Sequence, residues 1–321
     1  MSLLTSWLAS PPPDAAIEIA PDRVSAATLS SRGADPTVEA YAVEILPAGA
    51  VIASLSEPNI IDPDVVTAAV RTVLGRLGTR PTRLALVLPD SAAKVSLLHF
   101  DRIPTRRDDL DQLVRWQLRK STPFAIEDAA VSYTPGARST EGGGDFVVVM
   151  AKRKIVEEYE GVCAAAGAYA GLIDLTSLSV LNLILISSGT PAKDWLAVYM
   201  RPEYTTVAIV RDGHVIFFRN RPEGGEDSLA DLVHQTAMYY QDRLEGQRFA
   251  RVFLGGSGRT PDAVALARRS LDERLDSTVE PIDAVNITVG SDRNGVSAEQ
   301  MDVLAPLTGI LLRAQLAAVT P

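Results

Sequence analysis

The sequence predicts an α/β protein built from a duplicated unit, with a cleft between the two halves. The first observation is a three-stranded antiparallel meander over 195–220, in which Asp212-Gly213 supplies the positive-φ residues of a type I′ hairpin. The second is a copy of its first turn, since 16–27 align without a gap on 197–208 and both turns carry proline before an acid. Three of the twelve aligned pairs are identical, so the repeat rests mainly on its pattern of apolar and turn residues.

The remaining elements follow from apolar periodicity and from capping residues. Short apolar or alternating runs predict strands at 37–46, 83–88, 93–100, 131–134, 146–151 and 251–254. Helical spacing predicts helices at 62–77, 105–122, 155–168, 175–186, 229–244 and 261–275, and a last one after 297. Asp62, Thr105 and Ser297 are expected to cap three of these helices, because their side-chain oxygens can accept a hydrogen bond from the first turn.

Length and composition exclude several classes of protein. The 321 residues, 46% of them apolar and 22% charged, suffice for two domains with their own cores. A net charge of −9 argues against a nucleic-acid binder, which needs clustered Lys and Arg. The lone cysteine, Cys163, is expected to be buried, and three scattered histidines give no metal-ligand spacing. No apolar run is long enough to span a bilayer and no signal peptide begins the chain, so we expect a cytoplasmic protein.

The first 13 residues are predicted to be a separate N-terminal tail. Leu3, Leu4, Trp7 and Leu8 would share one face of a short helix, followed by a proline spacer. Two interpretations stay open: a weak contact with a membrane or partner, or a terminus that is mobile or docks on its own protein. The missing basic flank favours the second.

The segment 113–128 carries a family resemblance. It reads Leu-Val-Arg-Trp-Gln-Leu-Arg-Lys-Ser-Thr-Pro-Phe-Ala-Ile-Glu-Asp, an amphipathic helix followed by a Pro-Phe turn and an acidic stretch, and Tyr133 then lies in the next strand. With the two meanders, the Asp-Gly hairpin and the Gly-Gly-Ser-Gly segment at 255–258, this order resembles the PilM family of type IV pilus assembly proteins. The resemblance runs from about residue 14 to the end.

The resemblance implies an actin-like fold made of two duplicated RNase H-like domains, at 14–190 and 191–321. An inserted subdomain, over about 89–170, would be shared with the cell-division protein FtsA. Family members are cytoplasmic, bind a nucleotide between the lobes, and hold the cytoplasmic tail of the single-pass membrane protein PilN. The protein would thus lie at the inner membrane mainly through its partner. The cytoplasmic domain of the secretion protein GspL is a related case.

Carried onto this sequence, the family's nucleotide cleft looks degenerate. The first turn keeps a carboxylate, Glu18, but Pro21 offers no N–H to a phosphate. In the second turn Tyr199 replaces the expected Asp, Pro202 removes another donor, and Glu203 would repel a phosphate. One like-charge pair costs about 4 kcal/mol at 4 Å and intermediate dielectric. The other cleft candidates are Arg201, Thr205, Gly255, Gly256, Ser257 and Gly258.

Arg201 is the one residue of the second turn that could still attract a phosphate. On balance the sequence predicts a pseudo-ATPase, with no catalytic residue and no metal, and it disfavours ATP and magnesium as ligands. Peptide recognition is then the expected activity.

A partner groove is expected around the predicted helix at 105–122. Its candidate residues are Leu113, Trp116, Gln117, Pro123 and Phe124, and Trp116→Ala should abolish binding of the tail if they form it. Alternatively, Trp116 and Phe124 close the core of the inserted subdomain. An extended tail could also add a strand to the small inserted sheet.

Two other functions stay open: an active ATP-binding relative, for which Glu18 is the least poor candidate base, and a GspL-like secretion component. Self-association is a further alternative that composition does not decide.

Overall fold

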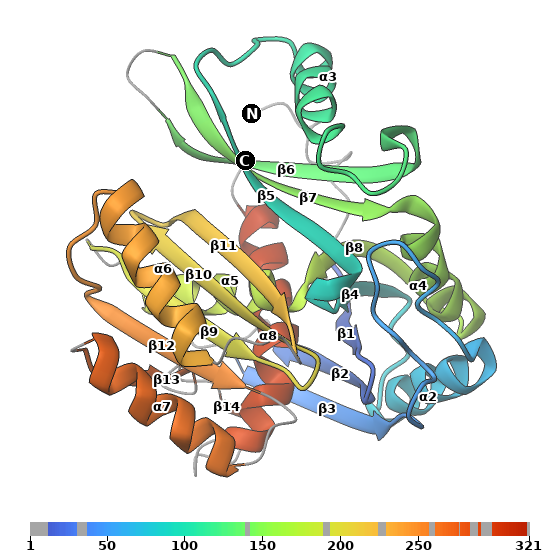
Figure 1. Ribbon diagram of the computed structural model, residues 1–321. Helices are drawn as coiled ribbons and strands as arrows, with labels where there is room; N and C mark the ends of the chain where they lie inside the picture. Colours follow the sequence, from blue (N-terminus) through green and yellow to red (C-terminus); the bar gives the residue numbers. More distant parts are fainter. Residues whose placement is uncertain are drawn as a thin grey trace.

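Two large sheets form the body of the protein, and five strands of the first follow the same order as the five strands of the second (Figure 1). The computed structural model describes residues 12–30, 37–138, 142–188, 193–223, 229–256, 261–275, 277–282, 288–289 and 297–319. The first sheet runs β14-β3-β2-β1-β4-β8 and the second β11-β10-β9-β12-β13. The first contains β1 (Ala15–Ile19), β2 (Arg23–Ser30), β3 (Thr37–Ile45), β4 (Arg83–Leu88), β8 (Tyr169–Leu175) and β14 (Thr288–Val289). The second contains β9 (Trp195–Met200), β10 (Tyr204–Arg211), β11 (His214–Pro222), β12 (Arg251–Gly256) and β13 (Val279–Pro281).

The predicted repeat is confirmed at the level of register. Ala16 pairs with Ala27 in the first sheet, and the aligned residues Ala197 and Ala208 pair in the second. Both turns also close with the same backbone hydrogen bond: Ala20 N–H donates to the Arg23 carbonyl at 2.9 Å, and Arg201 N–H donates to the Tyr204 carbonyl at 2.8 Å. The Asp-Gly hairpin has positive φ at both residues, as type I′ geometry requires.

Helices lie in three layers around the two sheets. α2 (Pro63–Arg76) and α4 (Arg153–Ala165) pack on the outer face of the first sheet. α6 (Leu229–Arg243) and α7 (Pro261–Leu275) pack on the outer face of the second. α5 (Thr176–Ser188) and α8 (Ala298–Val319) lie between the sheets in a shared core (Figure 1). This two-lobed arrangement, with one unit repeated, is the actin-like fold that the sequence predicted.

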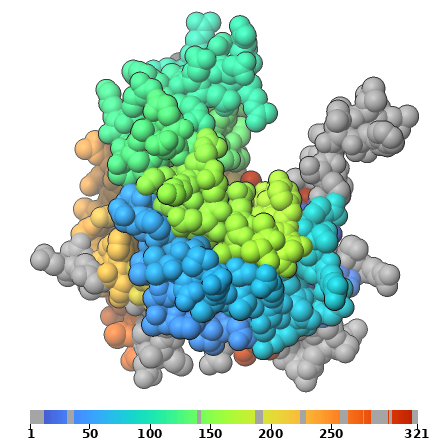
Figure 2. Space-filling model, turned by 90° about the vertical axis from the view of Figure 1, so that its right-hand side faces the viewer, coloured from blue at the N-terminus to red at the C-terminus, as the bar shows by residue number. Residues whose placement is uncertain are grey.

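A small sheet is inserted between β4 and β8. It contains β5 (Ala93–Phe100), β6 (Ala129–Arg138) and β7 (Gly144–Lys152), in the order β5-β7-β6, and α3 (Arg107–Leu118) covers one face. Figure 2 shows this part of the chain standing out above α4 and the first lobe. The three predicted strands are thus confirmed as one sheet, although β6 is longer than the predicted 131–134.

The helix boundaries test the predicted caps. Asp62 accepts a hydrogen bond from Val65 N–H at 3.1 Å, and Ser297 Oγ accepts one from Gln300 N–H at 3.2 Å, so both of these caps are confirmed. The Thr105 cap is wrong: α3 starts later, with Arg106 at the N-cap position and no side-chain capping bond. Cys163 is fully buried, as predicted, and burial raises its pKa to about 12.

The close crossing of α5 and α8 depends on Gly309. A Cβ added there would lie 1.9 Å from the Ser179 carbonyl oxygen, which belongs to the backbone of α5. We expect Gly309→Ala to lower the unfolding free energy by about 1–3 kcal/mol, because the helices must separate. Chemical denaturation followed by circular dichroism measures this effect.

Gly161→Ala is the matched control, since Gly161 is an exposed residue of α4 with no atom within 4 Å of the added carbon. It should raise stability by up to about 1 kcal/mol through helix propensity. Equal stability of the two variants would contradict the assignment of Gly309 to a tight helix crossing.

Candidate functional site

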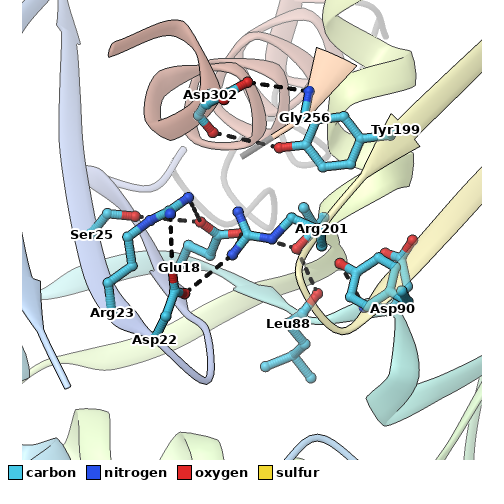
Figure 3. A network of polar contacts seen from close by, with 12 residues as sticks. Glu18, Asp22, Arg23, Ser25, Leu88, Asp90, Tyr199, Arg201, Gly256 and Asp302 are labelled. Carbon is cyan, nitrogen blue, oxygen red and sulfur yellow. Dashed lines mark hydrogen bonds and ion pairs between the residues drawn. The ribbon is translucent and has the colours of Figure 1, made fainter. Parts of the chain in front are cut away.

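The two repeated turns face one another across the cleft between the lobes (Figure 3). The turn between β1 and β2 carries Pro21 and Asp22, and the turn between β9 and β10 carries Arg201, Pro202 and Glu203. Neither proline has an N–H to offer a ligand. The structure therefore brings together the candidates that the sequence placed in the two turns.

Glu18 is a fully buried carboxylate at the centre of this arrangement. Its Oε2 accepts a hydrogen bond from Ser25 Oγ at 3.4 Å and its Oε1 accepts one from Thr176 Oγ1 at 3.0 Å. Arg23 Nη2 lies 3.7 Å from Oε2, and Arg201 Nη2 lies 4.0 Å from Oε1. Both oxygens thus have partners within the protein.

Arg201 crosses from the second lobe to the acids of the first. Its side chain is 2% exposed, and Nη2 lies 3.5 Å from Asp22 Oδ1 in addition to its contact with Glu18. Burial alone would lower the pKa of Arg201, but the negative charges of Glu18 and Asp22 raise it above its ordinary value. The guanidinium is therefore charged and faces two carboxylates of the first lobe, although it is the residue of the second turn that could have attracted a phosphate.

Tyr199 and the glycine segment meet at α8. Tyr199 is buried, its hydroxyl donates to the Asp302 carbonyl at 3.4 Å, and burial raises its pKa. The N–H of Gly256 donates to the Asp302 carboxylate at 3.3 Å. Gly255 packs tightly on Ile282, since an added Cβ would lie 2.3 Å from its Cδ1. The Gly256 N–H is thus already hydrogen-bonded to an acidic side chain of the protein, that of Asp302. Ser257 and Gly258 lie outside the described residues.

Asp90 is a cleft residue that the sequence analysis missed. It follows β4, is buried, and accepts hydrogen bonds from Ser177 N–H at 2.9 Å and Thr206 Oγ1 at 2.6 Å. Its own N–H donates to the Tyr204 hydroxyl at 3.3 Å, and burial raises the pKa of its carboxyl. The repeat could have indicated the contact between Thr206 and Asp90, because Thr206 aligns with Ser25. Each of these two hydroxyl groups donates a hydrogen bond to a buried carboxylate.

The other turn candidates lie at the rim or inside β10. Glu203 is half-buried, and burial raises its pKa. Thr205 is buried in β10, opposite Met200 of β9.

A separate cavity of about 520 Å³ lies between the small sheet, the first lobe and the β10–β11 hairpin. The small sheet contributes Ala93, Ala130, Thr134, Val147, Val149 and Ala151, the first lobe contributes Leu88, Ile173, Leu175, Leu178, Leu181 and Leu185, and the hairpin contributes Gly213, His214 and Val215. Most of these side chains are apolar. At one side, Arg313 and Asp174 form an ion pair at 2.5 Å. The cavity is an apolar space bordered by few charges, as peptide and ligand sites commonly are.

The predicted groove residues lie elsewhere. Leu113 and Phe124 pack against the core beneath α3, Gln117 and Pro123 are exposed, and Trp116 is 61% exposed with Lys120 Nζ 5.9 Å from its ring. None of these five is among the residues that line the cavity. The alternative reading, that they close the subdomain's core, fits Phe124 and does not fit Trp116.

Comparison with known proteins decides the family. The family model described as type IV pilus assembly protein PilM matches residues 16–248. The chain belongs to the PilM family. Among solved structures, a PilM-PilN type IV pilus biogenesis complex matches over 96% of this chain and 98% of that one, with 18% identity and a TM-score of 0.73. The structural match, at this low identity, shows a shared fold and no more.

Two weaker matches have TM-scores of 0.49. One is a Bacteroides thetaiotaomicron protein with an actin-like ATPase fold and unknown function, at 10% identity and covering 92% of this chain and 95% of that one. The other is the cytoplasmic domain of EpsL from the type II secretion system of Vibrio cholerae, at 11% identity and covering 94% of each chain.

The described residues of this PilM-family chain were compared with the requirements of a membrane-spanning helix and of a metal site. Among the helices in the described ranges, none combines the length and apolar character needed to cross a membrane. Within the same ranges, no cluster of His, Cys, Asp and Glu could hold a metal ion.

Proposed function

We propose that this PilM-family protein is a recognition component of a type IV pilus assembly platform. It holds an extended cytoplasmic segment of a PilN-like, single-pass membrane protein. The observation that carries this proposal is the apolar cavity between the small sheet and the first lobe, which adjoins the edge strand β6. A related PilM forms a complex with PilN, and this chain shares its fold. Through such a partner the protein would be held at the inner membrane.

The edge of the small sheet suits an extended segment. β6 ends the strand order, so among the described strands it has a neighbour on one side only. Backbone groups along such an edge can pair with an added strand, while side chains of the added strand enter neighbouring pockets. The edge of the small sheet is thus suited to a tail that docks in extended form.

We further infer that the cleft between the lobes does not take a magnesium nucleotide. The fold family implies one, but the described residues do not fit it. Glu18 is bonded by Ser25 and Thr176 and lies near two guanidinium groups, so it is poorly placed to hold Mg²⁺ through water. Arg201 faces carboxylates, and the Gly256 N–H is bonded to Asp302. Charges that a nucleotide and its metal would supply are provided by the protein's own side chains.

The binding proposal is tested with a synthetic peptide of the N-terminal cytoplasmic residues of the PilN-like protein from the same organism. Fluorescence anisotropy with the full chain should show saturable binding, and a scrambled peptide should not bind. A folded chain that leaves the peptide's anisotropy unchanged at high protein concentration would contradict the proposal.

A further inference from the structure

A second cavity, of about 550 Å³, lies on the other side of β6 beneath the start of α3. Its charged lining comes from Arg107, Asp111 and Arg115 of α3 and from Arg138 at the end of β6. Among the described residues that line it, three guanidinium groups are thus set against one carboxylate, an excess of two positive charges. The residues that it shares with the apolar cavity all belong to β6, and the function proposed above makes no use of its charges.

Arg115 marks one end of this cavity. Its Nη1 donates to the Ile126 carbonyl at 3.3 Å and to the Ala129 carbonyl at 3.5 Å, so the guanidinium is held beside the first residue of β6. A guanidinium has five N–H donors in a planar fork, and these two bonds use one of its nitrogens, so donors are left for a carboxylate. The charge at this end is therefore fixed in place by the backbone.

Arg107 and Arg138 mark the other end. Arg107 lies at the Tyr133 hydroxyl: burial raises the pKa of this hydroxyl, and the charge and the hydrogen bond of Arg107 lower it. Arg138 follows Tyr133 on the same strand. Tyr133 is four residues beyond Ala129 on β6, and Arg107 precedes Arg115 by eight residues on α3. These separations correspond to about 13 Å along a strand and about 12 Å along a helix, so the positive charges lie at two well-separated ends.

The wall between the two ends is apolar apart from Asp111. Leu110, Val131 and Phe146 line it. Asp111 lies about one helical turn from each of the two α3 arginines, and its carboxylate accepts a hydrogen bond from the Tyr133 hydroxyl. Its negative charge would repel an anionic group in the middle of the cavity. The cavity therefore suits a ligand that is apolar in the middle and anionic at both ends.

Charge and size indicate which ligand has this form. A carboxylate pairs with a guanidinium through two parallel hydrogen bonds. Two carboxylates neutralise the excess of two positive charges, whereas a single carboxylate or phosphate group would reach one end only. Small-molecule sites commonly have volumes of about 300–1,000 Å³, and this cavity lies within that range.

We propose that the cavity beneath α3 binds a short aliphatic dicarboxylate. One carboxylate pairs with Arg115 and the other with Arg107 and Arg138, while the methylene chain lies against Leu110 and Phe146. This site is additional to the cavity that we assign to the tail.

Calorimetric titration of the full chain with glutarate tests the proposal. Pentanoate is the matched probe, because it has the same number of carbon atoms and one carboxylate. Glutarate should give a saturable isotherm, and pentanoate should bind about 30-fold more weakly, since a charge-assisted contact is lost.

Variants of the arginines locate the site. Arg138→Gln should weaken glutarate binding about tenfold. Arg107→Gln combined with Arg138→Gln should bring the affinity for glutarate down to that for pentanoate, because one cationic end is gone. Both side chains are exposed, so the double variant should keep the melting temperature of the wild-type protein. Arg80→Gln, at an exposed position of the first lobe, is the control and should retain the wild-type affinity.

Three results would overturn the proposal: no saturable isotherm with glutarate at millimolar concentration, equal affinity of the wild-type protein for glutarate and pentanoate, or undiminished glutarate binding in the double variant. Because the tail peptide takes no part in this test, its result is independent of the function proposed above.

Discussion

Arg201→Met is expected to lower the unfolding free energy by about 3 kcal/mol, because it removes one partner of a buried ion pair. Glu18 would remain fully buried, with Arg23 at 3.7 Å as its nearest remaining cation. Arg201 also links the two lobes, since it belongs to the second and faces Glu18 and Asp22 of the first. We therefore expect faster amide hydrogen exchange in both turns. Urea denaturation and exchange mass spectrometry measure the two effects.

A double variant distinguishes the charge from the packing of Arg201. Glu18→Gln combined with Arg201→Met should recover most of the lost stability, because the uncompensated carboxylate is gone. Arg80→Met, at an exposed position, should change stability by no more than about 0.5 kcal/mol. If the Arg201→Met variant were as stable as the wild-type protein, the contacts of Arg201 with Asp22 at 3.5 Å and with Glu18 at 4.0 Å would contribute nothing to the free energy of unfolding.

Thr134→Trp is expected to weaken binding of the tail peptide about 30-fold, or roughly 2 kcal/mol, because the indole would fill the apolar cavity. Thr134 lines that cavity but is itself exposed, so that the larger side chain should not disturb the core of the small sheet. Anisotropy with the labelled peptide gives the affinity, and the melting temperature reports on folding.

Trp116→Ala is the informative comparison, since the sequence analysis placed the tail on that face of α3. Trp116 is 61% exposed and does not line the cavity, so we now expect its replacement to change the affinity by less than about threefold. Loss of binding in Trp116→Ala with full binding in Thr134→Trp would move the site to the outer face of α3.

The repeat was the part of the fold most accessible to sequence reasoning. Pro followed by an acid marks each first turn, and the ungapped alignment reproduced even the register, with Ala16 opposite Ala27 and Ala197 opposite Ala208. Local turn chemistry fixes register, so a local pattern was sufficient here.

Elements whose burial depends on distant parts of the chain were harder to predict. The strand β8 was not expected, because Gly171 and Asp174 interrupt its apolar pattern and its pairing with β4 is set by the whole sheet. The strand β6 was predicted too short, because Pro135-Gly136 resembles a strand end, although proline is tolerated at a sheet edge.

The site was predictable as a set of residues but not as a set of contacts. Pro21, Pro202 and Tyr199 could be recognised as departures from a nucleotide-binding pattern. The contact of Arg201 with Glu18 depends on how the lobes are placed, and no local pattern encodes it. Trp116 lay at the edge of an amphipathic stripe, where periodicity does not distinguish a core position from a surface one.

Calorimetric titration of the purified wild-type chain with magnesium ATP tests the central claim, that the protein's own side chains fill the roles of a nucleotide in the cleft. With ATP at millimolar concentration we expect only heats of dilution, and the melting temperature should be the same with and without the nucleotide. A saturable isotherm that disappears in Glu18→Gln would contradict the account.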